Sequence, residues 1–262
     1  MKLVKNILMK KISKISKKNN KYILLLSDNS SLSFYGEVII KYNLLKPRSI
    51  SDNELKEMSY YNTYLEAVDK ALVYISKKLR TKKEIIEKLK DYDPNIINKV
   101  ISKLELNGYL NDTLYITSYV NDQINLKTSG PKKIKRELLL KGFSEKKIDD
   151  YLSKIEDNIW KEKIKKIINK KINSNRSCSK NLLVKKIKID LINLGYEIDL
   201  INRELEFVNI EESDEVLSKE FHKLLKRYTK KYTERELKNK IKLNLYNKGF
   251  SLDKINKLID KM

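Results

Sequence analysis

Apolar residues in the second half of the chain recur in a fixed arrangement around a glycine. Aliphatic residues lie eight and four positions before the glycine, an aromatic residue follows it directly, and aliphatic residues lie six and ten positions after it. The three glycines are 53 and 54 residues apart. A repeated unit of this length is typical of stacked helical arrays, which act through an extended surface rather than a catalytic pocket. The three sets are Ile134, Leu138, Gly142, Phe143, Ile148 and Leu152; Ile187, Leu191, Gly195, Tyr196, Ile201 and Leu205; and Ile241, Leu245, Gly249, Phe250, Ile255 and Ile259.

This spacing predicts two helices that meet at the glycine. Apolar residues four positions apart lie on one face of a helix, and a glycine just past the helix end fits a left-handed C-cap. Ser144 and Ser251 are the expected N-caps of the following helix in the first and third sets. The aromatic residue is expected to fill the corner between the two helices.

An altered copy of the pattern lies at residues 85–101. It keeps the aliphatic spacing, but its connection is two residues shorter and uses Asp91, Asp93 and Pro94 in place of glycine. Thr81 and Glu84 predict a capping box at the start of this copy. Because another amphipathic stretch precedes each copy, the repeating unit is predicted to be three helices.

The N-terminal part lacks this pattern and predicts a small β element. Residues 22–26 are a short β-prone run, and residues 28–31 are a strong turn signal before a second such run. Residues 3–15 are compatible with an earlier strand or with a helix. Ser51 and Glu54 fit a capping box that opens a short linker helix.

The expected fold is mainly α, with tandem three-helix repeats forming an elongated curved array and a small N-terminal β element. A three-helix unit buries little apolar surface alone, so neighbouring repeats are expected to pack end to end. The expected domains are the β hairpin or small sheet with its linker helix at 1–58, followed by repeats at 59–110, 111–156, 157–209 and 210–262.

The net charge of +22 is distributed unevenly. Residues 127–190 contain 20 Lys and Arg against 8 Asp and Glu, an excess of +12. A general preference for Lys, Ile and Asn, as AT-rich coding produces, would spread the excess evenly. The uneven distribution instead favours a polyanionic partner, either nucleic acid or an assembly that contains it.

Other compositional features narrow the class of protein. The single cysteine excludes an internal disulfide and suits a reducing cytoplasm. No apolar run approaches the roughly 20 residues needed to cross a bilayer, so we expect a cytoplasmic protein without membrane association.

No pattern in the sequence predicts catalysis. His222 lies in an expected helix without converging partners, and Cys178 lies in a polar connector. Glycine-rich phosphate loops are absent. We therefore expect a non-enzymatic protein that needs no cofactor or metal.

Basic clusters are the candidate binding residues. They flank apolar helix positions such as Ile134, Ile164 and Ile187, so their side chains should project away from the core toward phosphates. Tyrosines at positions 60, 61, 64, 109, 115 and 119 could stack on bases, but most match apolar helix positions and core packing is the favoured interpretation. The candidate set is Arg80, Lys82, Lys83, Lys132, Lys133, Lys135, Arg136, Lys161, Lys163, Lys165, Lys166, Lys185, Lys186 and Lys188.

Several spaced motifs agree in order and distance with those of a known family. The run 106–112, Leu-Asn-Gly-Tyr-Leu-Asn-Asp, followed by Tyr115 and Tyr119, closely resembles the hallmark of the RecX family, whose members are bacterial regulators of the RecA recombinase. Residues 71–85 look like its entry motif, and residues 130–143 match its next helical pair. The shortened Asp-Pro connection departs from the pattern, and the last two repeats carry only the generic lattice.

The resemblance implies a function as well as a fold. Members of the family form curved tandem three-helix repeats and bind along RecA filaments on single-stranded DNA. It implies a protein that represses or tunes recombinase and coprotease activity, most simply an inhibitor in DNA repair and the SOS response, although a stimulatory member is an alternative. We expect the protein to be a monomer. Double-stranded DNA is an alternative ligand. Two other function classes stay open, namely a nucleic-acid-binding repeat protein independent of RecA and a helical protein-interaction scaffold.

Overall fold

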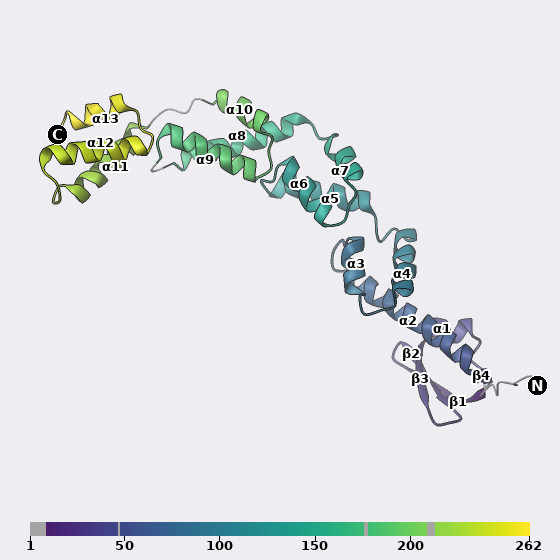
Figure 1. Ribbon diagram of the computed structural model, residues 1–262. Coiled ribbons are helices and arrows are strands. Elements are labelled where there is room, and N and C mark those ends of the chain that lie inside the picture. Colours follow the sequence, from purple (N-terminus) through teal and green to yellow (C-terminus); the bar gives the residue numbers. More distant parts are fainter. Residues whose placement is uncertain (1–8, 47, 176–177, 209–212) are drawn as a thin grey trace, which may run out of the picture. The chain divides into compact units, whose positions relative to one another are not determined.

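The computed structural model describes residues 9–46, 48–175, 178–208 and 213–262 (Figure 1). The chain divides into two compact units, Met1–Tyr115 and Ile116–Met262. The first unit contains an antiparallel sheet and one helical repeat, and the second contains three further helical repeats. These observations confirm the predicted mainly α-helical fold with a small N-terminal β element.

The N-terminal sheet has four antiparallel strands in the order β3-β2-β1-β4. The predicted run at 22–26 lies in a strand, and residues 9–15 of the ambiguous segment form a strand rather than a helix. The remaining residues of that segment, 3–8, lie outside the described ranges. Asn29 turns the chain with a φ of 63°, a conformation that asparagine adopts more readily than most residues. The strands are β1 (Met9–Lys18), β2 (Lys21–Leu26), β3 (Ser31–Tyr35) and β4 (Ser49–Ser51).

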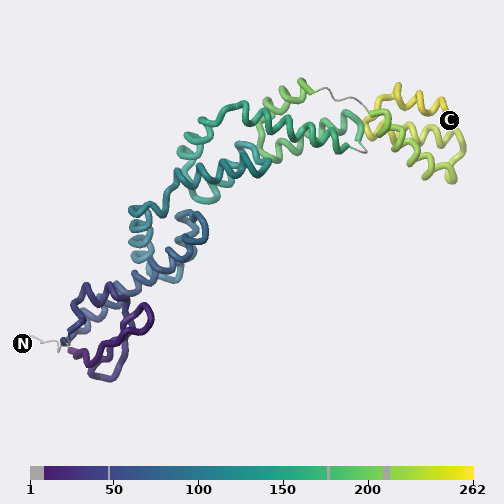
Figure 2. Tube along the Cα trace, turned by 180° about the vertical axis from the view of Figure 1, so that it is seen from behind, coloured from purple at the N-terminus to yellow at the C-terminus, as the bar shows by residue number. Residues whose placement is uncertain are grey.

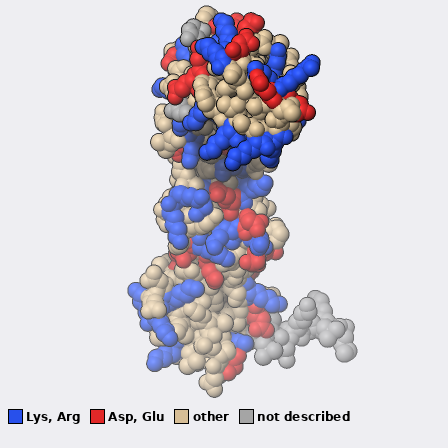
Figure 3. Space-filling model, turned by 90° about the vertical axis from the view of Figure 1, so that its left-hand side faces the viewer, with Lys and Arg blue, Asp and Glu red and all other residues tan. Residues whose placement is uncertain are grey.

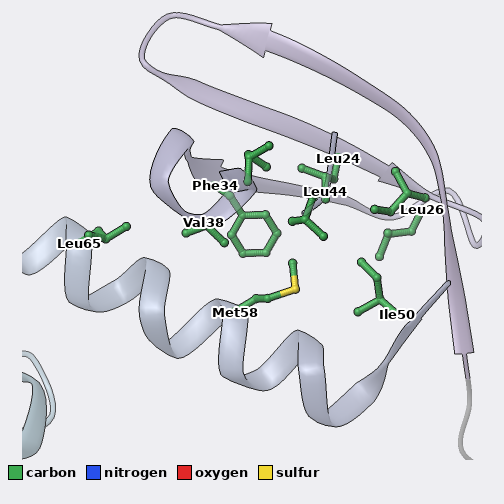
Figure 4. Packing of buried hydrophobic residues seen from close by; sticks show 10 residues of the cluster. Leu24, Leu26, Phe34, Val38, Leu44, Ile50, Met58 and Leu65 are labelled. Carbon is green, nitrogen blue, oxygen red and sulfur yellow. The ribbon is translucent and has the colours of Figure 1, made fainter. Parts of the chain in front are cut away.

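One face of the sheet packs on α1 (Gly36–Lys41) and α2 (Asp52–Ile75). Alternate residues of the strands point toward these helices, as the two-residue period of a strand requires. Figure 4 shows Phe34 from the sheet and Met58 from α2 pointing into the same apolar space, and both are buried. This core joins the strands to α2: Ile12, Leu24, Leu26, Phe34, Val38, Ile39, Leu44, Ile50, Met58 and Leu65.

The linker helix expected before residue 59 is the first part of a longer helix. Ser51 caps α2 by accepting a hydrogen bond from the Glu54 amide at 3.3 Å, but Glu54 pairs with Arg48 instead of completing a capping box. The helix then continues for 24 residues through the expected boundary between 58 and 59. Its first half covers the sheet and its second half forms the first helix of repeat 1.

Repeat 1 is completed by α3 (Lys82–Lys88) and α4 (Pro94–Leu106). The predicted capping box of Thr81 and Glu84 is present at the start of α3. The glycine-free connection ends where the Asp93 side chain accepts a hydrogen bond from the Asn95 amide at 2.8 Å and Pro94 opens α4. Proline suits this first helical position because the amide it lacks would have no partner within the helix.

The second unit contains three groups of three helices, and Figures 1 and 2 show each group gathered together. The boundary between 209 and 210 expected for the last repeat lies outside the described residues. The groups are α5 (Asp112–Leu126), α6 (Pro131–Leu140) and α7 (Glu145–Leu152); α8 (Asp157–Asn173), α9 (Lys180–Asn193) and α10 (Ile198–Glu206); and α11 (Asp214–Tyr228), α12 (Glu234–Asn247) and α13 (Leu252–Ile259).

The repeated apolar arrangement forms the core of these three groups. Its glycines have φ values of +94°, +89° and +81° at Gly142, Gly195 and Gly249, which confirms the predicted left-handed C-caps. The aromatic residue after each glycine is buried. At the second corner the Tyr196 hydroxyl donates to the Thr128 carbonyl at 3.1 Å, and burial raises the pKa of Tyr196 to about 12.

Hydrogen bonds between helix ends join these repeats. The C-terminus of α9 meets the N-terminus of α6, where the Gly130 amide donates to the Leu194 carbonyl at 2.7 Å and the Lys132 amide donates to the Gly195 carbonyl at 3.0 Å. Likewise, the Ser179 hydroxyl at the start of α9 donates to the Lys248 carbonyl at the end of α12, at 2.6 Å. Each joint places carbonyls with no partner in their own helix against donors at a helix N-terminus.

Candidate nucleic-acid interface

The basic cluster on α6 surrounds a fully buried Ile134, as its spacing predicts. Lys132 Nζ lies 2.6 Å from the Glu197 carboxylate. Lys135 Nζ lies 2.8 Å from Asp149 and 2.7 Å from Glu145, and hydrogen bonds to these carboxylates raise the pKa of Lys135. Two members form no ion pair with the described part of the chain: Lys133 and Arg136.

Lys163, predicted to bind phosphate, instead caps another helix. Its Nζ donates to the Gln123 carbonyl at 3.1 Å, to the Lys127 carbonyl at 2.7 Å and to the Ile124 carbonyl, all at the C-terminal end of α5. A positive charge is favourable there because it opposes the negative end of the helix dipole. Burial, reinforced by the charge of Lys166, lowers the pKa of Lys163. These contacts occupy the ammonium, and Lys163 therefore leaves the candidate set.

Replacing Lys163 with methionine is expected to destabilise the end of α5 by about 1–3 kcal/mol. Methionine keeps most of the apolar stem but leaves the backbone carbonyls without their donor. Hydrogen exchange over residues 120–127 and thermal unfolding measure the effect. The matched control is Lys166→Met, which removes a nearby charge that forms no ion pair with the described residues and should leave stability unchanged or slightly raised. Equal losses in the two variants would contradict the capping role.

The remaining candidate lysines on α8 divide into one paired and two unpaired side chains. Lys165 Nζ lies 3.2 Å from Glu162 and 4.0 Å from the buried Glu204. The pair with the exposed Glu162 contributes about 0–1 kcal/mol and can exchange partners readily. Two members have no ion-pair partner among the residues that the structure describes: Lys161 and Lys166.

The α9 cluster is more open. Lys186 Nζ lies 3.0 Å from the sulfur of the half-buried Cys178. Lys185 is exposed and Lys188 is half-buried, and neither forms an ion pair within the described ranges. Two cations at the surface of this helix are therefore open to an external anion.

The small cluster at the start of α3 is largely occupied by local contacts. The Arg80 guanidinium lies 3.6 Å from the Tyr74 ring centroid and 3.6 Å from the Glu84 carboxylate, and only 11% of its side chain is exposed. Lys82 Nζ pairs with Glu105 at 3.1 Å. Lys83 is exposed on the same helix. Arg80 therefore has a structural role and also leaves the candidate set.

Charge pairing separates the candidate residues into two groups. Figure 3 shows one face of the molecule, on which basic side chains lie beside acidic ones in several places. Six candidates form neither an ion pair nor a side-chain hydrogen bond with the described residues, and all lie on α6, α8 or α9 of the second unit. We call them the six unpaired cations: Lys133, Arg136, Lys161, Lys166, Lys185 and Lys188.

A cavity outside the candidate set lies in the first unit. It has a volume of 620 Å³ and combines aromatic rings with lysines. The signal for it in the sequence is the run of tyrosines near residue 60, whose apolar helix spacing favours core packing instead. We call this cavity the tyrosine groove; it is lined by Lys41, Tyr42, Lys56, Glu57, Tyr60, Tyr61, Tyr64 and Lys99.

The rings of the tyrosine groove contact one another and the lysines. Tyr61 and Tyr64 are stacked, with centroids 5.9 Å apart and ring planes 25° apart, and Tyr42 meets Tyr61 edge-on at 6.4 Å. Lys41 Nζ lies 3.7 Å from the Tyr61 centroid, and Lys99 Nζ lies 4.9 Å from the Tyr60 centroid. Burial raises the pKa of Tyr42, Tyr61 and Tyr64.

The described residues contain no group of three His, Cys, Asp or Glu side chains placed to hold a metal ion. His222 is exposed on α11, and its Nδ1 lies 2.7 Å from the Ser218 carbonyl. Among the described helices, none has the length and hydropathy needed to span a membrane.

Three segments of the chain match descriptions of one family. Residues 67–104 match "RecX, first three-helix domain", residues 111–152 match the second such domain, and residues 211–259 match the third. A protein named Regulatory protein RecX from Oceanobacillus iheyensis is 30% identical over 97% of this chain and 98% of its own length. The chain belongs to the RecX family.

Other RecX proteins show similar coverage. The Regulatory protein RecX of Streptococcus uberis is 30% identical over 96% of this chain and 99% of the relative, and that of Lactococcus lactis is 32% identical over 94% and 96%. A crystal structure of regulatory protein RecX covers 75% of this chain and 99% of its own, with 25% identity and a TM-score of 0.67. The crystal structure of RecX from Lactobacillus salivarius covers 55% of this chain and 94% of its own, with 32% identity and a TM-score of 0.52.

The segment that resembles the RecX hallmark joins two repeats. Gly108 follows α4 with a φ of +75°. Asn111 provides the cap of α5, because its side chain accepts a hydrogen bond from the Leu114 amide at 3.0 Å. These contacts give the turn a structural role in ending α4 and starting α5.

Proposed function

We propose that this RecX family protein binds RecA filaments on single-stranded DNA and inhibits their recombinase and coprotease activities. The observation that supports this proposal is the match to regulatory RecX proteins over nearly the whole chain, together with the three family domains. The protein acts by occupancy: it binds without transforming a substrate and needs no cofactor.

The six unpaired cations are the proposed contacts to DNA phosphates. An ammonium or guanidinium without an internal carboxylate gives up no ion pair when it meets a phosphate, whereas a paired lysine must exchange one partner for another. Such contacts release counterions, so binding weakens steeply with salt. The slope of the logarithm of the binding constant against the logarithm of the salt concentration is about −0.7 per contact on single strands. They fix position on the backbone and carry no base sequence information.

RecA-catalysed strand exchange with the protein titrated in tests the proposal. We expect strand exchange and ATP turnover to fall as the protein saturates the filament. Acceleration would contradict inhibition, and unchanged rates at saturation would contradict RecA as the target.

Charge-matched variants test the proposed contacts. Replacing the six unpaired cations with glutamine should weaken filament binding and reduce its salt slope by about 4. The control replaces six other lysines of the predicted clusters, each of which has a contact within the chain: Lys82, Lys83, Lys132, Lys135, Lys165 and Lys186. The two variants have equal net charge, so equal losses would contradict specific phosphate contacts. Circular dichroism of both variants checks that they fold.

A RecA-independent nucleic-acid-binding protein is the second candidate, which the net charge of +22 favours. Fluorescence anisotropy with bare and RecA-coated oligonucleotides separates the two functions. The proposed function requires tighter binding to the coated strand, and equal affinities would favour the second candidate. A protein-interaction scaffold would lose little binding in either glutamine variant.

A further inference from the structure

The tyrosine groove lies apart from the residues used by the proposed function. It belongs to the first unit, whereas the six unpaired cations belong to the second. Its floor is α2, which turns Met58 and Leu65 toward the sheet (Figure 4) and presents tyrosines along its flank. Tyr42, Tyr61 and Tyr64 pack against the edge of the core and are half-buried, whereas the Tyr60 side chain is 39% exposed.

The tyrosine groove contains several aromatic rings along α2. Tyr61 and Tyr64 are already stacked, and Tyr60 provides a further ring one position along the helix. Nucleic-acid bases stack on such rings with about 1–3 kcal/mol per base, whatever the base. The 620 Å³ volume lies within the range of about 300–1,000 Å³ typical of small-molecule sites.

The lysines of the groove rest on the rings by contacts that a ligand can replace. The ammonium groups of Lys41 and Lys99 face the Tyr61 and Tyr60 rings. A cation–π contact at an exposed site contributes only about 0.5–1 kcal/mol, which is less than a stacked base. A base that takes the ring face therefore displaces the ammonium, and the flexible lysine stem lets the charge meet the adjoining phosphate.

The charge of the lining also favours a polyanion. Lys41, Lys56 and Lys99 face the cavity with one carboxylate, Glu57, so the lining has a net positive charge. Glu37 lies outside the lining and interacts with the Tyr61 hydroxyl. An acidic peptide would satisfy the lysines but would leave the ring faces without stacking partners.

We infer that the tyrosine groove binds a short stretch of single-stranded DNA, with bases stacked on its tyrosines and phosphates held by its lysines. This inference rests on the proposed function in one respect only, namely that the bound single strand is DNA. It is a second point of attachment, in a different unit from the six unpaired cations, and it does not require RecA.

The test measures binding of the full chain to a fluorescent thymidine oligonucleotide of about 15 nucleotides without RecA. Tyr60→Leu should weaken binding about tenfold, because it keeps apolar bulk but removes the ring. Tyr60→Phe should retain binding. An oligonucleotide of the same length with abasic sites should bind the unmodified protein about as weakly as the thymidine strand binds Tyr60→Leu. Photo-crosslinking with 5-iodouracil should label residues 56–64.

Tyr246→Leu is the matched control, since Tyr246 is an exposed tyrosine on α12 in the second unit. It should bind DNA like the unmodified protein, and circular dichroism checks the fold of each variant. Equal binding by the Tyr60→Leu and Tyr246→Leu variants would overturn the inference, as would unweakened binding of the abasic strand. Loss of RecA binding with unchanged DNA binding in Tyr60→Leu would identify a protein-docking groove and would also overturn it. Since RecA is absent from the binding assay, failure of the proposed function does not affect this result.

Discussion

A Gly195→Ala variant is expected to lose about 3–5 kcal/mol of stability in the second unit. Alanine at this position would keep a φ of +89°, which is strained for a residue with a side chain. Its Cβ would also lie 2.4 Å from the Lys133 backbone nitrogen, so α6 and α9 would have to separate. Separation would break the hydrogen bonds that the Gly130 and Lys132 amides donate across this joint.

Hydrogen exchange at the Gly130 and Lys132 amides, combined with thermal unfolding, measures this effect. The matched control is Gly108→Ala. Gly108 has a similar φ of +75°, but the Cβ that alanine adds there would meet no described atom within 4 Å beyond its chain neighbours. The Gly108→Ala control should lose only the stability that a left-handed backbone conformation costs a residue with a side chain, about 1–2 kcal/mol. If both alanine variants lose the same stability and Gly130 and Lys132 stay protected, close packing at the joint is not what requires glycine.

Lys248→Met is expected to destabilise the last repeat by about 2–4 kcal/mol. Glu220 is 5% exposed, and its carboxylate is bonded by the Lys248 ammonium. Its other cationic neighbour, Lys223 Nζ, is 3.9 Å away on a mostly exposed side chain. The variant therefore leaves a buried carboxylate with weak compensation, and thermal or urea unfolding should register the loss.

The double variant Glu220→Met with Lys248→Met distinguishes charge burial from packing. Replacing both members of a buried pair with apolar residues is often nearly neutral, so the double variant should recover most of the lost stability. A double variant no more stable than Lys248→Met alone would show that the loss came from packing around Lys248.

The helical repeats could be predicted because their determinants are local in sequence. A four-residue apolar period selects one helix face, and a glycine at a left-handed position ends the helix. Both rules are confirmed at Gly142, Gly195 and Gly249. The capping box at Thr81 and Glu84 is equally local and is also confirmed.

Features that depend on distant parts of the chain escaped prediction. Nothing near Lys163 indicates that its ammonium reaches a carbonyl 40 residues earlier. The pairing of Lys132 with Glu197 likewise follows from the joint between α6 and α9. The tyrosine groove could not be predicted because Tyr60, Tyr61 and Tyr64 fit an apolar helix face, and only the position of α1 and α4 leaves them partly open.

The joints between helix ends have a consequence for how such a protein can evolve. Their main hydrogen bonds at α6 and α9 run from backbone to backbone, so they place few demands on chemical identity beyond the glycines and the proline. Residues on the outer helix faces can therefore be substituted without weakening the joints. The charge of the outer surface can in this way change between relatives while the scaffold stays the same.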